Sequence, residues 1–251
     1  MTGARRLPIE GGARARSTAG RAIYAVGAVH GRYDRFAALL EAIVADLAAA
    51  PAGPTPLLVF CGDLIDRGPE APEVLAALVW LSRRAPAEVR VLRGAQEAAM
   101  LGFLDRPETL HTWLAIGGEA TLQAYGVPPG NDAAVIRDAL VDRLPASHLA
   151  LLRAAAAETH CGDYVFGGPT TRTDRVLVHP GDAPASRRAL AIAPGARAAL
   201  RLEGASAEWL EAGAAAAATY EPPLPDEPPP PAESAEVVTM RDALARLRPG
   251  Y

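Results

Sequence analysis

The apolar run Leu57–Phe60, followed at once by Gly62, Asp63, Asp66 and Arg67, constrains the fold more than any other segment. Consecutive apolar residues indicate a buried strand, and Gly62 lets the backbone turn sharply where that strand ends. In open α/β sheets, ligands bind at the carboxyl edge of the strands. Two carboxylates and a guanidinium at this edge are suited to a metal-bound phosphate. The segment therefore predicts a strand that leads into a ligand-binding loop.

The segments around this strand alternate between strand and helix patterns. Apolar runs at Ala22–Val26 and Val89–Leu92 predict two further strands, and helical periodicity covers Tyr33–Ala50 and Pro72–Arg84. This alternation predicts a largely parallel sheet with helices outside it.

The later segments predict more helix and a second sheet. Helical patterns continue over Glu97–Leu104 and Thr109–Ile116, and a Cys-Gly-Asp turn within His160–Phe166 leads into a strand. Three more short strands are expected to complete a second, more antiparallel sheet, at Val176–Val178, Ala189–Ile192 and Ala198–Leu202.

Composition divides the chain into four parts. Residues 1–20 are rich in small and polar residues and predict a flexible lead, and residues 21–213 form the folded domain. Residues 214–235 are rich in Ala and Pro and predict a disordered, extended linker. Residues 236–251 have apolar residues at helical spacing, which predicts a short amphipathic helix. A tethered helix of this kind is suited to docking on a protein partner, although folding back onto its own domain or fraying would fit the pattern equally well.

Charge and cysteine content exclude several classes of protein. The chain of 251 residues has a net charge of -4, so no broad basic surface predicts nucleic-acid binding. No apolar segment is long enough to span a membrane, and the N-terminus lacks the apolar core of a secretory signal. With only Cys61 and Cys161, no disulfide framework is expected, and we expect a cytoplasmic protein.

The segment Gly62–Gly68 resembles the G-D-x-[VI]-D-R-G element of the calcineurin-like metallophosphoesterases, in their serine/threonine protein phosphatase branch. The order Trp113-Leu114, Gly117-Gly118, Thr121-Leu122 and Tyr125-Gly126 resembles a stretch of the bacterial members. The resemblance implies an α/β fold in which two mixed sheets form a sandwich flanked by helices. It also implies the fold of a phosphoric-monoester hydrolase with two divalent metals.

The other family elements are present in outline but lack most of their chemical residues. The G-D-x-H-G element reads Gly27-Ala28-Val29-His30-Gly31, so an alanine replaces a metal-binding carboxylate and His30 is kept. The G-N-H-E element reads Gly94-Ala95-Gln96-Glu97, so the metal-binding asparagine and the general-acid histidine are both absent. By this resemblance, Asp66 would orient the general acid, and Asp66 and Gln96 are its vestiges.

The last two elements are altered further. Gly168 replaces a ligand histidine, whereas Arg172 matches a family arginine and, with Arg67, is expected to bind phosphate. The connection to the last histidine motif is shortened, and the ligand falls on Gly181 or, with a shift of one residue, on Asp182. The resemblance thus leaves His30 and Asp63 as vestigial metal ligands, with Asp182 as a third in the shifted alignment.

This ligand set predicts that no metal cofactor is held. Two divalent cations about 4 Å apart need anionic ligands between them, and one carboxylate with one neutral imidazole is insufficient. Gln96 cannot release a proton near neutral pH, so the general acid is lost as well. If the protein were active, it would need two metals, such as Mn, Fe, Zn or Mg.

Three functions remain open from the sequence. The first is a pseudophosphatase, inactive or very weak, that binds a phosphorylated protein or a small phosphoester through Arg67 and Arg172. The second is an active hydrolase with a rebuilt ligand set, and the third is a scaffold that acts through its C-terminal helix. A purely structural role for the Gly62–Gly68 loop, with Asp66 capping a helix and pairing with Arg67, is a further alternative.

Overall fold

The computed structural model describes residues 5–8, 17–50, 53–167, 176–180, 189–192, 195–204 and 206–212. The predicted linker at 214–235, the predicted helix at 236–251, and Gly168, Arg172, Gly181 and Asp182 lie outside these residues.

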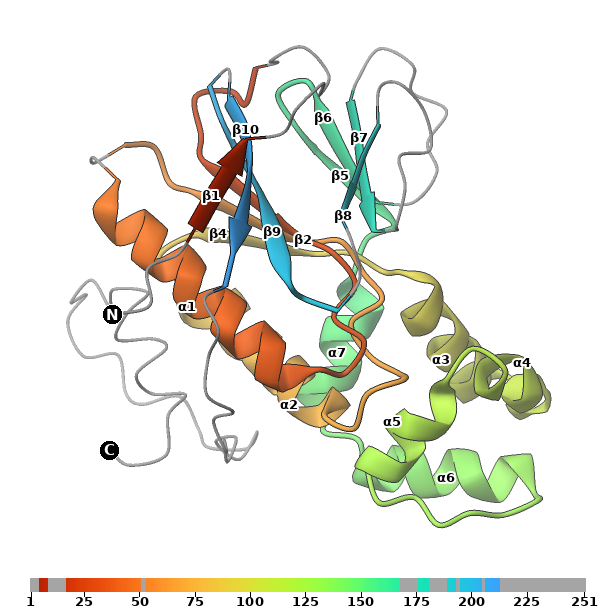
Figure 1. The fold of residues 1–251 in the computed structure, drawn as a ribbon. Coiled ribbons are helices and arrows are strands. Elements are labelled where there is room, and N and C mark those ends of the chain that lie inside the picture. Colours follow the sequence, from red (N-terminus) through yellow and green to blue (C-terminus); the bar gives the residue numbers. More distant parts are fainter. Residues whose placement is uncertain are drawn as a thin grey trace, which may run out of the picture.

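Two mixed sheets and a set of helices make up the described part of the chain (Figure 1). The larger sheet has the strand order β1-β10-β9-β2-β3-β4. Its strands are β1 (Arg5–Pro8), β10 (Ser206–Glu211), β9 (Ala198–Glu203), β2 (Ile23–Val26), β3 (Leu57–Phe60) and β4 (Glu88–Val91). The smaller sheet has the order β5-β6-β7-β8, formed by Glu158–Cys161, Tyr164–Gly167, Val176–Pro180 and Ala189–Ile192. The expected α/β fold of two mixed sheets flanked by helices is confirmed.

The helices form two groups. Helices α1 (Tyr33–Ala49) and α2 (Ala71–Arg84) lie along one side of the larger sheet (Figure 1). A helical lobe follows β4; it comprises α3 (Ala95–Asp105), a 3-10 turn (Pro107–Thr109), α4 (Leu110–Leu114), α5 (Gly118–Ala124) and α6 (Ala133–Arg143). Helix α7 (Ala146–Ala154) returns the chain to the smaller sheet. None of the helices in the described residues is both long and apolar enough to cross a bilayer.

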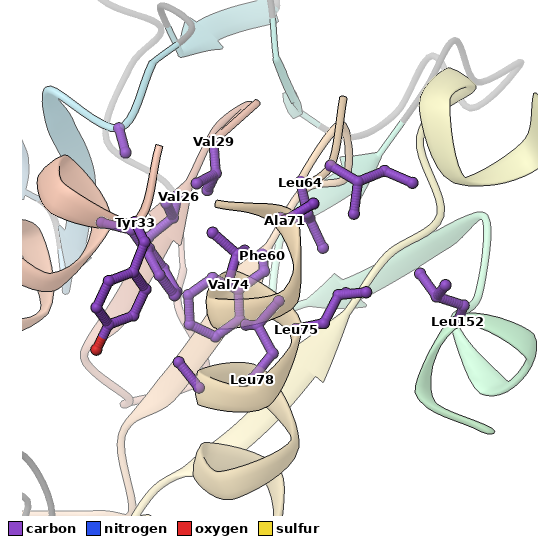
Figure 2. Close-up of a cluster of buried hydrophobic side chains, with 14 of the residues drawn as sticks. Val26, Val29, Tyr33, Phe60, Leu64, Ala71, Val74, Leu75, Leu78 and Leu152 are labelled. Carbon is purple, nitrogen blue, oxygen red and sulfur yellow. The ribbon is translucent and has the colours of Figure 1, made fainter. Parts of the chain in front are cut away.

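Side chains of the central strands point alternately to the two faces of the sheet, and the apolar side chains on each face form one of two cores. On β2 and β3, one set of side chains faces α1 and α2, while the other set packs against the smaller sheet. The first set comprises Tyr24, Val26, Leu58 and Phe60, and the second comprises Ile23, Ala25, Leu57 and Val59. Figure 2 shows Val26 and Phe60 beside Val74, Leu75 and Leu78 of α2. A strand covered on both faces reads as an unbroken apolar run, which is why the sequence located β2 and β3 so closely.

The strand content was predicted well, but two assignments were wrong. The segment 198–203 does not join the second sheet: β9 pairs antiparallel with β2 in the larger sheet. In the smaller sheet, β7 pairs with β6 and β8 in parallel, and only β5 and β6 are antiparallel. Strand periodicity identifies a strand but says little about its neighbour, because several arrangements bury the same apolar faces.

The N-terminal lead is also more ordered than expected. Arg5–Pro8 forms β1, which pairs antiparallel with β10 at the edge of the larger sheet. Thr18 is 1% exposed, and its hydroxyl accepts the backbone N–H of Gly204 at 3.2 Å. Parts of residues 1–20 therefore belong to the domain, because backbone pairing with β10 compensates for their poor apolar content.

A buried ionic network fixes α1 on the larger sheet. Asp46 of α1 accepts hydrogen bonds from Tyr24 Oη at 2.7 Å, Arg201 Nε at 2.7 Å and Arg6 Nε at 2.6 Å. The side chains of Asp46 and Arg201 are each 4% exposed. Removing one partner of a buried pair leaves the other charge desolvated and unpaired.

We therefore expect Asp46→Ala to lower the free energy of unfolding by about 3–5 kcal/mol, because Tyr24 and Arg201 would lose their buried acceptor and Arg201 would keep only Glu203 and Glu208, which are more exposed than Asp46. Urea denaturation measures this change. The matched control is Asp138→Ala, which breaks an ion pair with Arg137 on the surface, where Asp138 is 66% exposed. The control should cost less than about 1 kcal/mol. Equal losses in the two variants would contradict the role assigned to the network.

Candidate functional site

Three loops meet at the carboxyl edge of β2, β3 and β4, which are parallel neighbours. The backbone N–H groups of Val29 and His30 both donate to the carbonyl of Asp63 at 3.0 Å, and Gly31 N–H donates to the carbonyl of Leu64 at 2.8 Å. These bonds bring His30 and Asp63 together, as the family resemblance implied.

One buried carboxylate joins the β3 loop to the start of α3. Glu97 is fully buried and accepts the backbone N–H groups of Asp63 at 2.9 Å, Leu64 at 2.7 Å and Gly94 at 2.8 Å. The close approach requires glycine, since a Cβ on Gly94 would lie 2.4 Å from the backbone nitrogen of Asp63. Burial raises the pKa of Glu97, and the three amide donors counteract that effect.

Asp63, the expected bridging ligand, caps a helix in this structure. Its Oδ1 accepts the backbone N–H of Gln96 at 3.1 Å, within the first turn of α3. A carboxylate is favoured at a helix N-terminus by the free amide groups and the helix dipole. The carboxylate is therefore stabilised without any metal.

Two other positions where the family has metal ligands carry alanine, whose side chain has no donor atom. The methyl group of Ala28 is buried, with the residue 2% exposed, and Ala95 is exposed at the start of α3. Within the described residues, no group of three or more His, Cys, Asp or Glu side chains could hold a metal ion. His30 and Asp63 alone do not fit a two-metal centre, and Arg172 and Asp182 lie outside the described residues.

Two buried polar atoms at this site, His30 Nδ1 and Gln96 Oε1, have no hydrogen-bond partner in the part of the chain that the structure describes. Burial, followed by the nearby guanidinium of Arg67, lowers the pKa of His30, while Asp63 opposes the shift. The imidazole is therefore neutral near pH 7. Unpaired buried polar atoms cost about 1–3 kcal/mol each, so the site retains polar groups that the fold itself does not use.

Asp66 has a different role from either of those the sequence suggested. Among the described residues it neither caps a helix nor forms an ion pair with Arg67, so the details expected for a structural loop are not found, while a structural role of the loop stays open. Instead, Oδ2 accepts Trp113 Nε1–H at 2.9 Å and Oδ1 accepts the Thr121 hydroxyl at 2.6 Å. Burial is the largest influence on this carboxyl and raises its pKa to about 6. Neither contact reaches Gln96, so the former acid-orienting residue is bound to the helical lobe.

Arg67 is the exposed cation of the site. Its backbone N–H donates to the carbonyl of Gly117 at 3.1 Å, and its Nε donates to the carbonyl of Ile116 at 3.3 Å. The side chain lies against Gly117, where an added Cβ would be 2.7 Å from Arg67 Cγ. No carboxylate of the described residues forms an ion pair with Arg67. Its charge is thus held in place and available to an anion.

Sequence reasoning located these residues but missed the partners of Asp66. Trp113 and Thr121 stood out only as landmarks of the resemblance. Trp113 is fully buried and stacked on Phe103, with ring centroids 5.3 Å apart. A buried tryptophan needs an acceptor for its N–H, and this requirement was the one available signal.

Residues 22–138 match the family model of the calcineurin-like phosphoesterases. The match agrees with the resemblance that the sequence motifs indicated. The serine/threonine protein phosphatase branch stays a prediction. No curated protein is similar enough to count as a match.

Several solved structures are similar at low identity. A protein assigned as a diadenosine tetraphosphatase has a TM-score of 0.47 at 14% identity, over 80% of this chain and 100% of that one. A protein serine/threonine phosphatase of Saccharomyces cerevisiae has a TM-score of 0.34 at 16% identity, over 69% of this chain and 55% of that one. A cold-active protein-tyrosine phosphatase of a psychrophilic Shewanella has a TM-score of 0.34 at 19% identity, over 66% and 43% of the two chains. Because these scores are low, the fold assignment depends on the sheet topology.

We expect Glu97→Gln to lower the free energy of unfolding by about 2–4 kcal/mol, because the amide NH₂ would face backbone N–H groups that need an acceptor. Thermal and urea unfolding measure the loss. The matched control is Glu119→Gln on the exposed surface of α5, where Glu119 accepts only from Gln123 at 3.2 Å, and it should change stability by less than about 0.5 kcal/mol. A Glu97→Gln variant as stable as the control would show that the loop junction does not depend on this carboxylate.

Proposed function

We propose that the protein is a pseudophosphatase that binds a phosphorylated protein or a small phosphoester without hydrolysing it. One observation carries the proposal: Arg67 is exposed, fixed by two hydrogen bonds to the lobe and free of a carboxylate partner among the described residues. The catalytic groups that would surround it are replaced by a methyl at Ala28 and an amide at Gln96.

Binding and turnover need different groups, and the described residues supply a group for binding. An exposed guanidinium forms strong, charge-assisted hydrogen bonds with a phosphate. Hydrolysis would need a metal-activated water and a proton donor, and the described residues supply neither. Arg172 is proposed as a second phosphate contact, by its place in the family motif. Two free, buried thiols, Cys61 and Cys161, are consistent with a cytoplasmic protein.

We expect the purified protein to contain no stoichiometric Mn, Fe or Zn, and to give no turnover of p-nitrophenyl phosphate with added manganese. Metal analysis of the protein and a colorimetric assay test this. The comparison variant is Ala28→Asp, Ala95→Asn, Gln96→His and Gly168→His combined, which restores donor atoms at four positions. Stoichiometric metal with turnover in the unaltered protein would contradict the proposal and favour the active hydrolase with a rebuilt ligand set.

Arg67→Gln should weaken the binding of phenyl phosphate about tenfold or more, because a charge-assisted contact is lost. Line broadening or calorimetry measures the affinity. Arg106→Gln is the control, since Arg106 is also exposed on the helical lobe but lies on the loop before the 3-10 turn. No measurable binding by the unaltered protein, or equal binding by both variants, would overturn the proposal.

Removing residues 214–251 distinguishes the pseudophosphatase hypothesis from the hypothesis of a scaffold that acts through its C-terminal helix. If the cleft binds the ligand, the truncated protein keeps its affinity for phenyl phosphate, because Arg67 and its supports lie in residues 61–124. If phenyl phosphate binding is lost with a folded domain, the C-terminal segment is part of the binding function and the proposal in its present form fails.

A further inference from the structure

Asp66 and Arg67 are neighbours in sequence, and the same piece of the helical lobe holds both. The Gly117-Gly118 turn supplies the carbonyl that accepts the Arg67 backbone N–H and the surface that supports the Arg67 side chain. The two side chains that bind Asp66 come from the helices on either side of this turn, Trp113 from α4 and Thr121 from α5. Asp66 therefore holds the turn from both ends while the turn holds Arg67.

These contacts bind Asp66 to the helical lobe. Each carboxylate oxygen is engaged by one donor of the lobe, and the backbone N–H of Asp66 donates to the Thr121 hydroxyl at 3.0 Å. The Thr121 hydroxyl thus accepts from the backbone and donates to the side chain of the same residue. Such a closed set of bonds defines the orientation of all its members.

We propose that Asp66 is a positioning residue for anion binding, setting the direction of the Arg67 guanidinium through the Gly117-Gly118 turn. This inference rests on the proposed function, which supplies Arg67 as the anion contact. It assigns to Asp66 a role other than orienting a general acid. Glutamine stands at the position of that acid, and no hydrogen bond of the described residues joins Gln96 to Asp66.

The cost of this arrangement supports a positioning role. Asp66 and Arg67 have φ values of 66° and 60°, a region that non-glycine residues rarely adopt. A carboxylate with no exposed surface is also costly, since burial disfavours its charged form. Protonating Oδ1 would leave the Thr121 hydroxyl hydrogen without an acceptor. The ionised Asp66 carboxylate therefore gives the better-defined turn, although burial disfavours the ionised form.

The pH dependence follows from the groups that face this carboxyl. Trp113 of α4 and Thr121 of α5 donate hydrogen bonds to it. The charge of Arg67 favours the ionised carboxyl, and the charge of Asp63, on the same loop, disfavours it. Glu97 of α3 accepts the backbone N–H of Asp63. Since the pKa rises from 3.8 to about 6 on folding, the folded state binds this proton more tightly. This group's contribution to stability is therefore present below about pH 4 and is lost as the pH rises to about 6.

The first test needs no ligand. In a nitrogen-15 NMR spectrum, the Arg67 Nε–H and Trp113 Nε1–H signals can be assigned by their absence from Arg67→Gln and Trp113→Phe. Both signals should shift together with a midpoint near pH 6, and Asp66→Asn should abolish this midpoint and broaden the Arg67 signal. An Arg67 signal that is unchanged in a folded Asp66→Asn protein would overturn the proposal, whether or not phosphate binds.

The second test uses a matched pair at Thr121. Thr121→Val removes the hydroxyl and Thr121→Ser keeps it, so only the valine variant should lose the Arg67 Nε–H signal and bind phenyl phosphate more weakly, by about three- to tenfold. At pH 8, Asp66→Asn should bind phenyl phosphate more weakly while its unfolding midpoint is kept or raised. If Asp66 acted only as a nearby negative charge, its removal would strengthen anion binding, and that result would refute positioning.

The two proposals fail in different ways. If the unaltered protein binds no phenyl phosphate but the Arg67 signal still depends on Asp66, the function proposed for the cleft is wrong and the positioning contact stands. If phenyl phosphate binds through Arg67 and neither Asp66→Asn nor Thr121→Val changes the signal or the affinity, the positioning role is wrong and the binding function stands.

Discussion

The buried carboxylate of Glu97 is the contact on which the geometry of this site depends. Loops after two parallel strands must come within backbone contact, and their N–H groups cannot pair with one another. Glu97 solves this by accepting from Asp63, Leu64 and Gly94 at the same point. The junction is held by hydrogen bonds within the chain, so the loops keep their shape whether or not a metal is bound.

The strained backbone conformations lie in the two loops that carry the motif residues. Four non-glycine residues of the two loops have φ between 52° and 66°, namely His30, Asp63, Asp66 and Arg67. Such backbone conformations cost on the order of 1–3 kcal/mol each and persist only where the surroundings enforce them. Here the backbone hydrogen bonds between the two loops hold His30 and Asp63, and contacts with the helical lobe hold Asp66 and Arg67. Ala28 and Ala95 supply no side-chain donor atoms, while hydrogen bonds within the chain hold the backbone of both loops.

The sequence predicted what depends on local pattern and missed what depends on distant partners. β3 was placed at Leu57–Phe60 because a strand buried on both faces is apolar at every position. β9 was assigned to the wrong sheet, since the partner that buries its Arg201 against α1 is Asp46, which lies 155 residues away, whereas Glu203 and Glu208 are close in sequence. The lobe contact of Asp66 was missed for the same reason, its partners being 47 and 55 residues distant. The motif residues themselves came from the family resemblance, and spacing alone could not have assigned their roles.

The acids of this site are stabilised by donors within the chain. In a two-metal centre, carboxylates are balanced by divalent cations, and removing the cations would normally leave repelling charges. Here Asp63 and Glu97 both accept backbone N–H groups at the start of α3, and Asp66 accepts from Trp113 and Thr121. Each acid that remains is thus bound by donors that do not depend on a metal.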